Sequence, residues 1–215
     1  MTSSCRRAPA PRGYDGLGDA STRRSTLDGV VDARAVVLVE GISDLVALET
    51  LAERYGRDLA TEGVSVVAMG GAQAIGGFLE RLGPRGLDVR LAGLCDVGEE
   101  REFRRGLERA GLGSNLDRAR MEALGFYVCE PDLEAELIRA LGAELVLEVV
   151  EAHGDLGPFR TLQKQAEWRG RPVEDQLRRF IGSGGSRKTR YARYLVDALE
   201  PADVPRPLDR LLIAI

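Results

Sequence analysis

The acidic residues of this sequence gather at points where apolar runs end. Glu40 closes the run AVVLVE, Asp44 follows four residues later, and Asp96 closes the run DVRLAGLCD. A further acidic group follows the run GFYVC and consists of Glu130, Asp132, Glu134 and Glu136. Carboxylates that gather in one place repel one another unless a cation joins them, and oxygen ligands suit hard cations such as Mg²⁺ or Mn²⁺. The pattern raises the hypothesis of a divalent metal site, although each acid taken alone is more often a helix-start or surface residue.

These acids can act together only if the fold brings the ends of the strands to one edge. Four short β-branched runs each precede a segment with helical periodicity, at 35–40, 64–69, 88–96 and 125–129. Such an alternation predicts an α/β fold, with a sheet of about four parallel strands and flanking helices. Ligands of open parallel sheets bind beyond the carboxyl ends of the strands. We therefore expect the acids that follow the first, third and fourth strands to meet there.

The first helix is predicted to begin at the second acid. Ser43 is a suitable N-cap and Gly56 a suitable stop, which predicts a helix from about Asp44 to Tyr55. A carboxylate in the first helical turn also gains roughly 0.3–1 kcal/mol from the helix dipole. This alternative explains Asp44 but not Glu40. The second strand ends in MGGAQ, and the segment MGGAQAIGG lacks the lysine and Ser/Thr of a Walker phosphate loop.

The length and composition predict one core with an extension. The 215 residues are 44% hydrophobic, and residues 1–30 are rich in Pro, Gly, Ser and Arg without an apolar period, which predicts a disordered arm. The α/β core is expected over residues 31–142, and residues 143–215 should form a helical carboxy-terminal extension that completes the site. The sequence contains neither an apolar run of membrane-spanning length nor a signal peptide, and its three cysteines form no disulfide framework. We expect a cytoplasmic protein without a membrane partner.

The charge is distributed unevenly along the chain. The net charge is −4, but residues 160–194 hold ten basic residues against three acids, which gives +7 there and −11 elsewhere. This segment suits a polyanionic partner such as nucleic acid, while a solvated helical face is the alternative. Only Lys164 and Lys188 are lysines among thirty basic residues. The sequence thus uses arginine almost everywhere that it has a basic residue. A lysine in such a sequence suggests a position where the broader guanidinium of arginine cannot replace a compact ammonium.

Four segments together resemble the Toprim domain of the OLD (overcoming lysogenization defect) nucleases: LVEGISD, GLCDVGEE, CEPDLEAELIRALG and GSGGSRKTRYARYL. The resemblance covers about residues 33–200. In Toprim domains a glutamate after the first strand and an Asp-x-Asp after the third bind divalent metal. The resemblance makes Glu40 this glutamate, Asp44 the second acid of the OLD branch, and Asp96 the first aspartate of the pair. Gly98 stands where the second aspartate would be, which leaves water, Glu99 or the later acidic cluster to take its place.

The resemblance also implies the rest of the site. Asp132 and Glu134 match carboxylates that complete a second metal site, Glu136 faces elsewhere, and Lys188 matches a lysine near the scissile phosphate. The implied function is that of a metal-dependent endonuclease that hydrolyses phosphodiester bonds with two Mg²⁺ or Mn²⁺ ions, DNA being favoured over RNA. Glu40, Asp96 and Lys188 would be catalytic. The residues expected to contact nucleic acid are Arg187, Lys188 and Arg190, with Trp168, Tyr191 and Tyr194 holding the strand.

Other readings stay open. The larger OLD proteins carry an ATPase domain ahead of Toprim, so any ATP dependence here is expected to come from a partner chain. Gly98 favours a non-catalytic Toprim module that binds nucleic acid or a protein. A receiver-like domain, with Asp96 as the phosphoacceptor, also gathers acids at the ends of the first and third strands, but its lysine belongs at the end of a late strand rather than in a helix.

Overall fold

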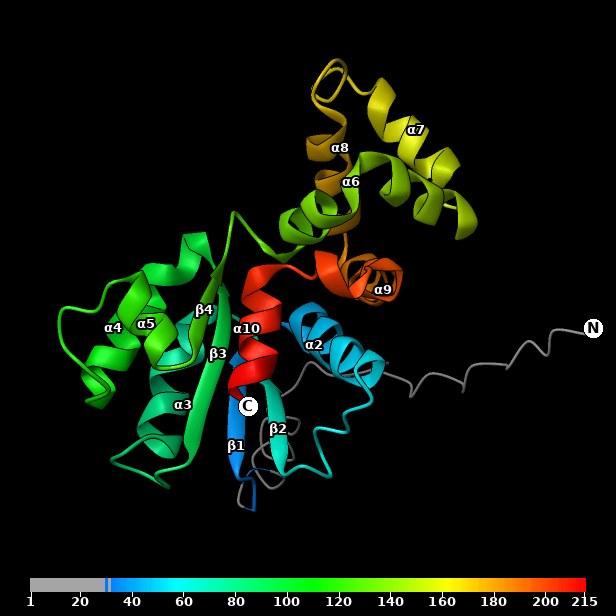
Figure 1. Ribbon diagram of the computed structural model, residues 1–215. Helices are drawn as coiled ribbons and strands as arrows, with labels where there is room; N and C mark the ends of the chain where they lie inside the picture. Colours follow the sequence, from blue (N-terminus) through cyan, green and yellow to red (C-terminus); the bar gives the residue numbers. More distant parts are fainter. Residues whose placement is uncertain (1–29, 31) are drawn as a thin grey trace, which may run out of the picture.

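The computed structural model describes Val30 and residues 32–215, so the predicted N-terminal arm lies outside the described residues except for Val30. Four strands form one parallel sheet in the order β2-β1-β3-β4 (Figure 1). Their bounds are β1 Ala35–Val39, β2 Val64–Ala68, β3 Arg90–Asp96 and β4 Phe126–Cys129. All five residues of β1 are buried, as expected for a central strand covered on both faces. The predicted α/β fold with four parallel strands is confirmed.

Nine α-helices follow or flank the strands of the described chain. They are α2 Ile42–Arg54, α3 Ile75–Leu82, α4 Glu100–Ala110, α5 Arg118–Ala123, α6 Leu133–Ala152, α7 Leu156–Lys164, α8 Val173–Gly182, α9 Gly185–Ala198 and α10 Arg206–Ala214. The short helix α5 was not predicted from the sequence. No helix in the described part of the chain is long and apolar enough to cross a membrane.

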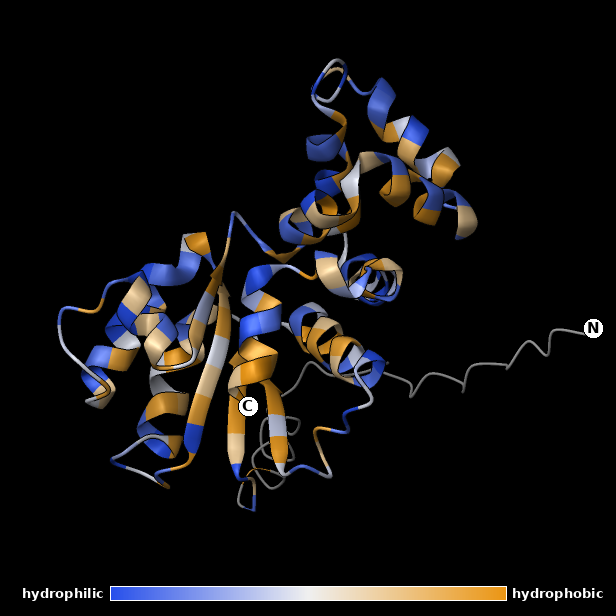
Figure 2. Cartoon of the chain, in the orientation of Figure 1, coloured by the Kyte–Doolittle hydropathy of each residue, from blue (hydrophilic) through white to orange (hydrophobic). Residues whose placement is uncertain are grey.

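Two apolar clusters fill the space on the two faces of the sheet. Val36 and Leu38 of β1 contribute to the cluster under α3, α4 and α5, while Val37 and Val39 contribute to the cluster under α2, α6, α9 and α10. The alternation follows from the two-residue period of a strand. In Figure 2 the strands are largely orange, and blue residues concentrate on the outer surfaces of the helices. Helices therefore cover both faces, and the strand ends are left to form a site.

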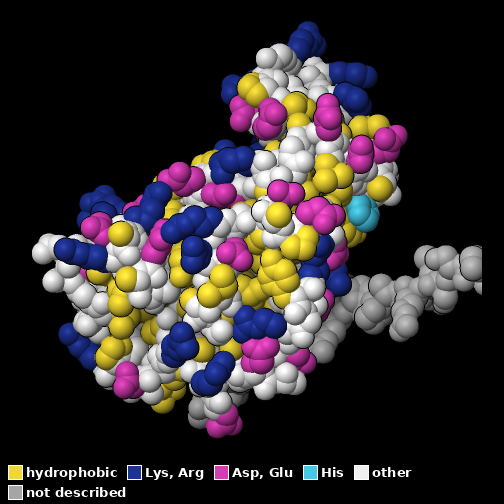
Figure 3. All heavy atoms as spheres, viewed as in Figure 1, with side chains coloured by type: hydrophobic (Ala, Val, Ile, Leu, Met, Phe, Trp, Pro, Cys, Tyr) yellow, Lys and Arg dark blue, Asp and Glu magenta, His cyan; other side chains and the backbone are white. Residues whose placement is uncertain are grey.

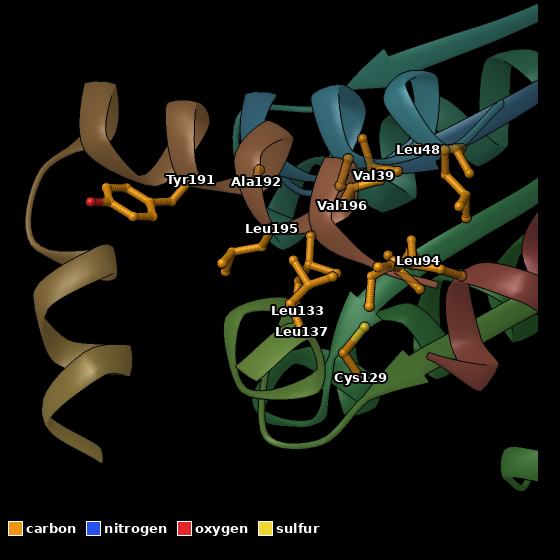
Figure 4. Packing of buried hydrophobic residues seen from close by; sticks show 14 of the residues in the cluster. Val39, Leu48, Leu94, Cys129, Leu133, Leu137, Tyr191, Ala192, Leu195 and Val196 are labelled. Carbon is orange, nitrogen blue, oxygen red and sulfur yellow. The ribbon is translucent and has the colours of Figure 1, made fainter. Parts of the chain in front are cut away.

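The carboxy-terminal half leaves the sheet and returns to it. Helix α6 bends at Gly142 (φ 75°, ψ 153°), and the segment that follows, together with α7 and α8, projects away from the sheet (Figure 1). We call residues 143–182 the helical lobe. Helix α9 then packs along α2, and α10 packs on β3 and β4. Figure 4 shows the buried side chains of this contact, including Val39, Leu48, Leu94, Leu195 and Val196.

Side chains of the core hold the returning helices in place. Arg54 at the end of α2 donates to the carbonyl of Val196 at 2.8 Å, and Arg90 at the start of β3 donates to the carbonyl of Ala214 at 2.7 Å. These bonds join residues that lie more than a hundred positions apart in the sequence. Helix α9, whose first turn carries Lys188, is thereby held at its C-terminal end against α2.

Helix α2 begins earlier than the sequence predicted. Its N-cap is Gly41 rather than Ser43, and its first residue is Ile42 rather than Asp44. The reason is local, because Asp44 Oδ2 accepts the backbone N–H of Gly41 at 2.8 Å and so closes the helix start from its third position. Gly56, with φ 71°, follows the helix as expected.

Candidate metal centre

The ends of three strands are tied together around Glu40. The Glu40 side chain extends from the end of β1 to β3, where Oε1 accepts the backbone N–H of Asp96 at 2.8 Å. The Glu40 carbonyl accepts the N–H groups of Gly70 and Gly71 beyond β2, at 3.0 Å each. Both glycines have positive φ (76° and 122°), which lets the chain turn back over this carbonyl. The backbone and side chain of Glu40 are therefore both hydrogen-bonded at the edge of the sheet, and Asp96 lies directly beside Glu40.

Two helix starts bring further carboxylates to this edge. Asp44, in the first turn of α2, is 7% exposed, and Glu134, in the first turn of α6, is 5% exposed. Asp132 is the N-cap of α6, where its Oδ1 accepts the N–H of Ala135 at 2.9 Å. Its Oδ2 accepts from Arg178 of α8 at 2.6 Å. The acids thus come from the ends of β1 and β3 and from the starts of α2 and α6.

The carboxylates are buried close enough to influence one another. Burial raises the pKa of Glu40 to about 7, and the carboxylates of Asp44 and Glu99 act in the same direction. Burial also raises the pKa of Asp96 to about 8, again with help from Glu40 and Asp44. The pKa of Glu134 is raised by burial and by Asp132. Burial therefore favours the neutral forms of these carboxyl groups, and a cation bound among them would favour the charged forms.

One ammonium group lies among these acids. Lys188, in the first turn of α9, places Nζ 3.2 Å from Glu134 Oε2. Burial acts to lower the pKa of Lys188, but the carboxylates of Glu134 and Asp44 outweigh it and the pKa is raised. Lys188 therefore stays charged, and it balances only part of the negative charge around it.

The donor set fits hard divalent cations in its chemistry. Carboxylate oxygens are the ligands that Mg²⁺ and Mn²⁺ prefer, and here they are buried and mutually repelling. No group of three or more His, Cys, Asp or Glu side chains in the described residues is already arranged around a common point as metal ligands. Glu40 is bonded to a backbone N–H, and Glu134 is paired with Lys188. Binding of an ion therefore requires rotation of these side chains.

Gly98 leaves an open space next to Asp96. It lies in the 3₁₀ turn Val97–Glu99, and a Cβ built on it would meet no atom within 4 Å. The space for a second carboxylate is present, but the carboxylate is not. Glu99 is near enough to raise the pKa of Glu40 and is the acid available at this turn.

Two acids of the fourth strand end stay apart from the cluster. Glu130 pairs with Arg118, and Glu136 accepts the N–H of Glu130 at 2.8 Å and pairs with Arg139. Glu136 is thus engaged by Arg139 and by the backbone of Glu130 rather than by the cluster.

Arg187, which was expected to contact nucleic acid, is half-buried against the end of α8. Its Nη1 donates to Ser183 Oγ at 2.7 Å, and its guanidinium lies over the Phe180 ring, 4.3 Å from the centroid. The carbonyls at the end of α8 and the aromatic ring draw the guanidinium inward. Arg190, in contrast, is exposed.

The expected role of Tyr191 in holding a strand is wrong. Tyr191 is 0% exposed, and its hydroxyl donates to Asp155 Oδ2 at 3.0 Å. Its ring lies edge-on to Phe180 and to Tyr194, so it belongs to the apolar core between α9 and the helical lobe. Tyr194 stacks on His153 with ring centroids 3.5 Å apart, which occupies one face of its ring. Tyr191 and Tyr194 both lie on the side of α9 that packs against the apolar cluster.

A cavity of about 560 Å³ opens beside the cluster, and sequence reasoning missed it. Its lining residues are Asp132, Glu134, Trp168, Arg171, Asp175, Arg178, Arg179, Gly182 and Lys188. The basic segment gave a signal, since all four lining cations fall within residues 160–194. The cavity itself could not be read from the sequence, because its walls come from α6, α8, α9 and the connection between α7 and α8.

Comparisons with known proteins agree with the resemblance drawn from the sequence. Residues 33–97 match the family described as overcoming lysogenization defect protein-like, TOPRIM domain. The fold is similar to the C-terminal region of the Xanthomonas campestris pv. campestris OLD protein, at 27% identity and a TM-score of 0.69, over 87% of this chain and 94% of that one. The C-terminal region of the Burkholderia pseudomallei OLD protein shares the fold at 20% identity and a TM-score of 0.65, over 85% and 96%. No curated protein matches.

Proposed function

We propose that this chain, which carries an OLD-like Toprim domain, is a nuclease that cleaves phosphodiester bonds with the help of Mg²⁺ or Mn²⁺. One observation carries the proposal. Glu40, directly after β1, lies against Asp96 of β3, and the buried acids Asp44 and Glu134 share this edge of the sheet with Lys188. A group of carboxylates with one ammonium suits a substrate that is itself an anion and binds through divalent cations.

The residues divide into two sets according to the elements that hold them. Glu40, Asp44 and Asp96 would hold one ion, and Asp132 and Glu134 would hold a second. Divalent cations bound there would supply an activated water and stabilise the leaving oxygen. The ions would also relieve the repulsion among these carboxylates.

Lys188 would act on the phosphate. It now contacts Glu134, so it would turn from this carboxylate to the phosphate when an ion takes over the Glu134 oxygens. A preorganised cation that neutralises charge in the transition state contributes about 10²–10³ in rate. We propose DNA as the substrate in preference to RNA, and an ATPase as the protein partner.

A non-catalytic module is the second candidate, and a specific observation favours it. Gly98 supplies no carboxylate at the second position of Asp-x-Asp, although there is space for one. Such a module would bind nucleic acid without cutting it. The receiver-like alternative is not favoured, because Lys188 lies in the first turn of α9 rather than at the end of a strand.

Nicking of supercoiled plasmid tests the proposal. Wild type, Glu40→Gln and Lys188→Ala would be compared in Mn²⁺, in Mg²⁺ and in EDTA, with Glu148→Gln as a control. Glu148 is an exposed glutamate of α6, so its variant makes the same chemical change away from the cluster. We expect wild type and the control to nick only with metal, Glu40→Gln to be inactive, and Lys188→Ala to be slower by about 10²–10³. Wild type that never nicks would favour the non-catalytic module.

A further inference from the structure

The cavity leads away from the candidate metal centre into the helical lobe. Glu134 and Lys188, which belong to the acid cluster, form one wall, and Trp168 in the connection between α7 and α8 lies on another. On the face shown in Figure 3, Lys and Arg side chains gather at the tip of the lobe. A chain that has a phosphate at the cluster would therefore have its neighbouring nucleotide at the mouth of this cavity.

Two cations of the cavity, Arg171 and Arg179, form no ion pair with a carboxylate of the described residues. Arg178 and Lys188 are paired with Asp132 and Glu134. Arg179 lines the same cavity and makes no side-chain hydrogen bond or ion pair within residues 32–215. An exposed guanidinium in a concave site is well suited to a phosphate, which it binds in a bidentate manner.

The cavity also contains an aromatic side chain, Trp168, on which a planar group could stack. Trp168 is half-buried and packs against the core of the lobe, and the guanidinium of Arg171 lies 5.2 Å from the centroid of its ring. The guanidinium occupies part of the exposed indole face, so a base that stacks there would displace it. Nucleobases stack on the same kind of aromatic surface, at about 1–3 kcal/mol per base, and do so without regard to sequence.

We infer, on the basis of the proposed function, that this cavity receives one unpaired nucleotide of a single strand, next to the bond that is cleaved. Its base would stack on Trp168 and its phosphate would bind Arg179. The volume of about 560 Å³ is that of a small-ligand site, for which about 300–1,000 Å³ is usual. A base inside a duplex is covered by its neighbours and cannot reach the indole, so it must leave the stack or come from a single strand. The substrate class is therefore nucleic acid with unpaired nucleotides at the cutting site.

Trp168 provides the readout, because it is the sole tryptophan of the chain. Its fluorescence emission would be followed in EDTA and in Ca²⁺ while a probe is added to the wild type. Two probes are a labelled single-stranded oligonucleotide and the same sequence in which every second position is abasic. The other two are the blunt duplex of that sequence and thymidine monophosphate. Anisotropy of the label measures affinity separately. Variants would be Arg179→Ala, Trp168→Ala and Trp168→Phe. The control is Arg160→Ala, which removes an equal charge on α7 outside the cavity.

We expect the single strand to change the Trp168 emission at lower concentrations than the abasic strand, the duplex or the mononucleotide. Arg179→Ala and Trp168→Ala should each weaken single-strand binding roughly tenfold, whereas Trp168→Phe and Arg160→Ala should change it by less than about twofold. The inference is overturned if the duplex changes the Trp168 emission at the same concentrations as the single strand, or if no probe changes the emission. It is also overturned if the mononucleotide binds as tightly as the oligonucleotide, or if Arg179→Ala binds the single strand as tightly as Arg160→Ala does. Plasmid nicking with an unchanged emission would reject this inference alone, while a changed emission without nicking would reject the proposed nuclease alone.

Discussion

Replacing Lys188 with alanine should lower stability in the absence of divalent cations. Lys188 Nζ lies 3.2 Å from Glu134 Oε2, and the Glu134 side chain is 6% exposed while that of Lys188 is 32% exposed. At an effective dielectric constant of about 20, two unit charges at this separation attract by about 5 kcal/mol before desolvation is counted. Removing one partner of a buried pair costs about 3–5 kcal/mol, because the other charge is left buried. Since Lys188 is partly exposed, we expect about 2–3 kcal/mol.

The same variant should gain more from Mg²⁺ than the wild type does. Without the ammonium, the Glu134 oxygens are free to bind the cation, so Mg²⁺ should restore part of the loss. Urea unfolding in EDTA and in millimolar Mg²⁺ measures both effects. Arg139→Ala is the control, because Arg139 is 59% exposed and pairs with Glu136 outside the cluster, where about 0–1 kcal/mol is expected. The reasoning is refuted if Lys188→Ala loses no more than Arg139→Ala in EDTA, or if Mg²⁺ adds equally to Lys188→Ala and to the wild type.

Three further predictions concern the site and the lobe. Gly98→Asp should be tolerated, because a Cβ there meets no atom within 4 Å, and should tighten Mn²⁺ binding in a calorimetric titration; unchanged binding would show that position 98 faces away from the ion. Burial raises the pKa of Glu40 to about 7 and that of Asp96 to about 8, so the folded state binds more protons than the unfolded state between about pH 5 and 8. In EDTA the free energy of unfolding should therefore fall as pH rises through this range, and Glu40→Gln should flatten the slope; a rise would contradict the burial of these acids. Tyr191→Phe should cost about 1 kcal/mol in urea unfolding through the lost bond to Asp155 and leave nucleic-acid affinity unchanged; weaker binding at normal stability would contradict its place in the core.

The sheet could be predicted because buried parallel strands leave a strong signal. Every residue of β1 is apolar and buried, so the strand reads as a continuous apolar run, and the next polar residue is Glu40. Parallel strands share a carboxyl edge, which is why Glu40 and Asp96 could be expected side by side. The sequence also placed Asp44 in the first turn of α2, but it predicted the start of this helix two residues too late. The helix begins earlier because the Asp44 side chain accepts the backbone N–H of Gly41.

The helical lobe and α9 could not be predicted to the same depth. Tyr191 lies in a strongly basic segment, and the charge of its neighbours suggested an exposed face. In the structure Tyr191, Ala192, Leu195 and Val196 form a buried stripe of α9, a helical period that the charge pattern obscured. The cavity was out of reach for a different reason, because Trp168 and Glu134 come together only after α6 bends and the chain returns through α8 and α9.

Binding of Mn²⁺, followed by isothermal titration calorimetry, tests most directly whether the acids at the carboxyl edge of the sheet form a divalent metal centre. Wild type, Glu40→Gln and the exposed control Glu148→Gln would be titrated under the same conditions. The account predicts saturable binding to the wild type and the control, and binding weakened at least roughly tenfold in Glu40→Gln. A wild type that binds no Mn²⁺ at millimolar concentrations, or Glu40→Gln that binds it as the wild type does, would contradict the account.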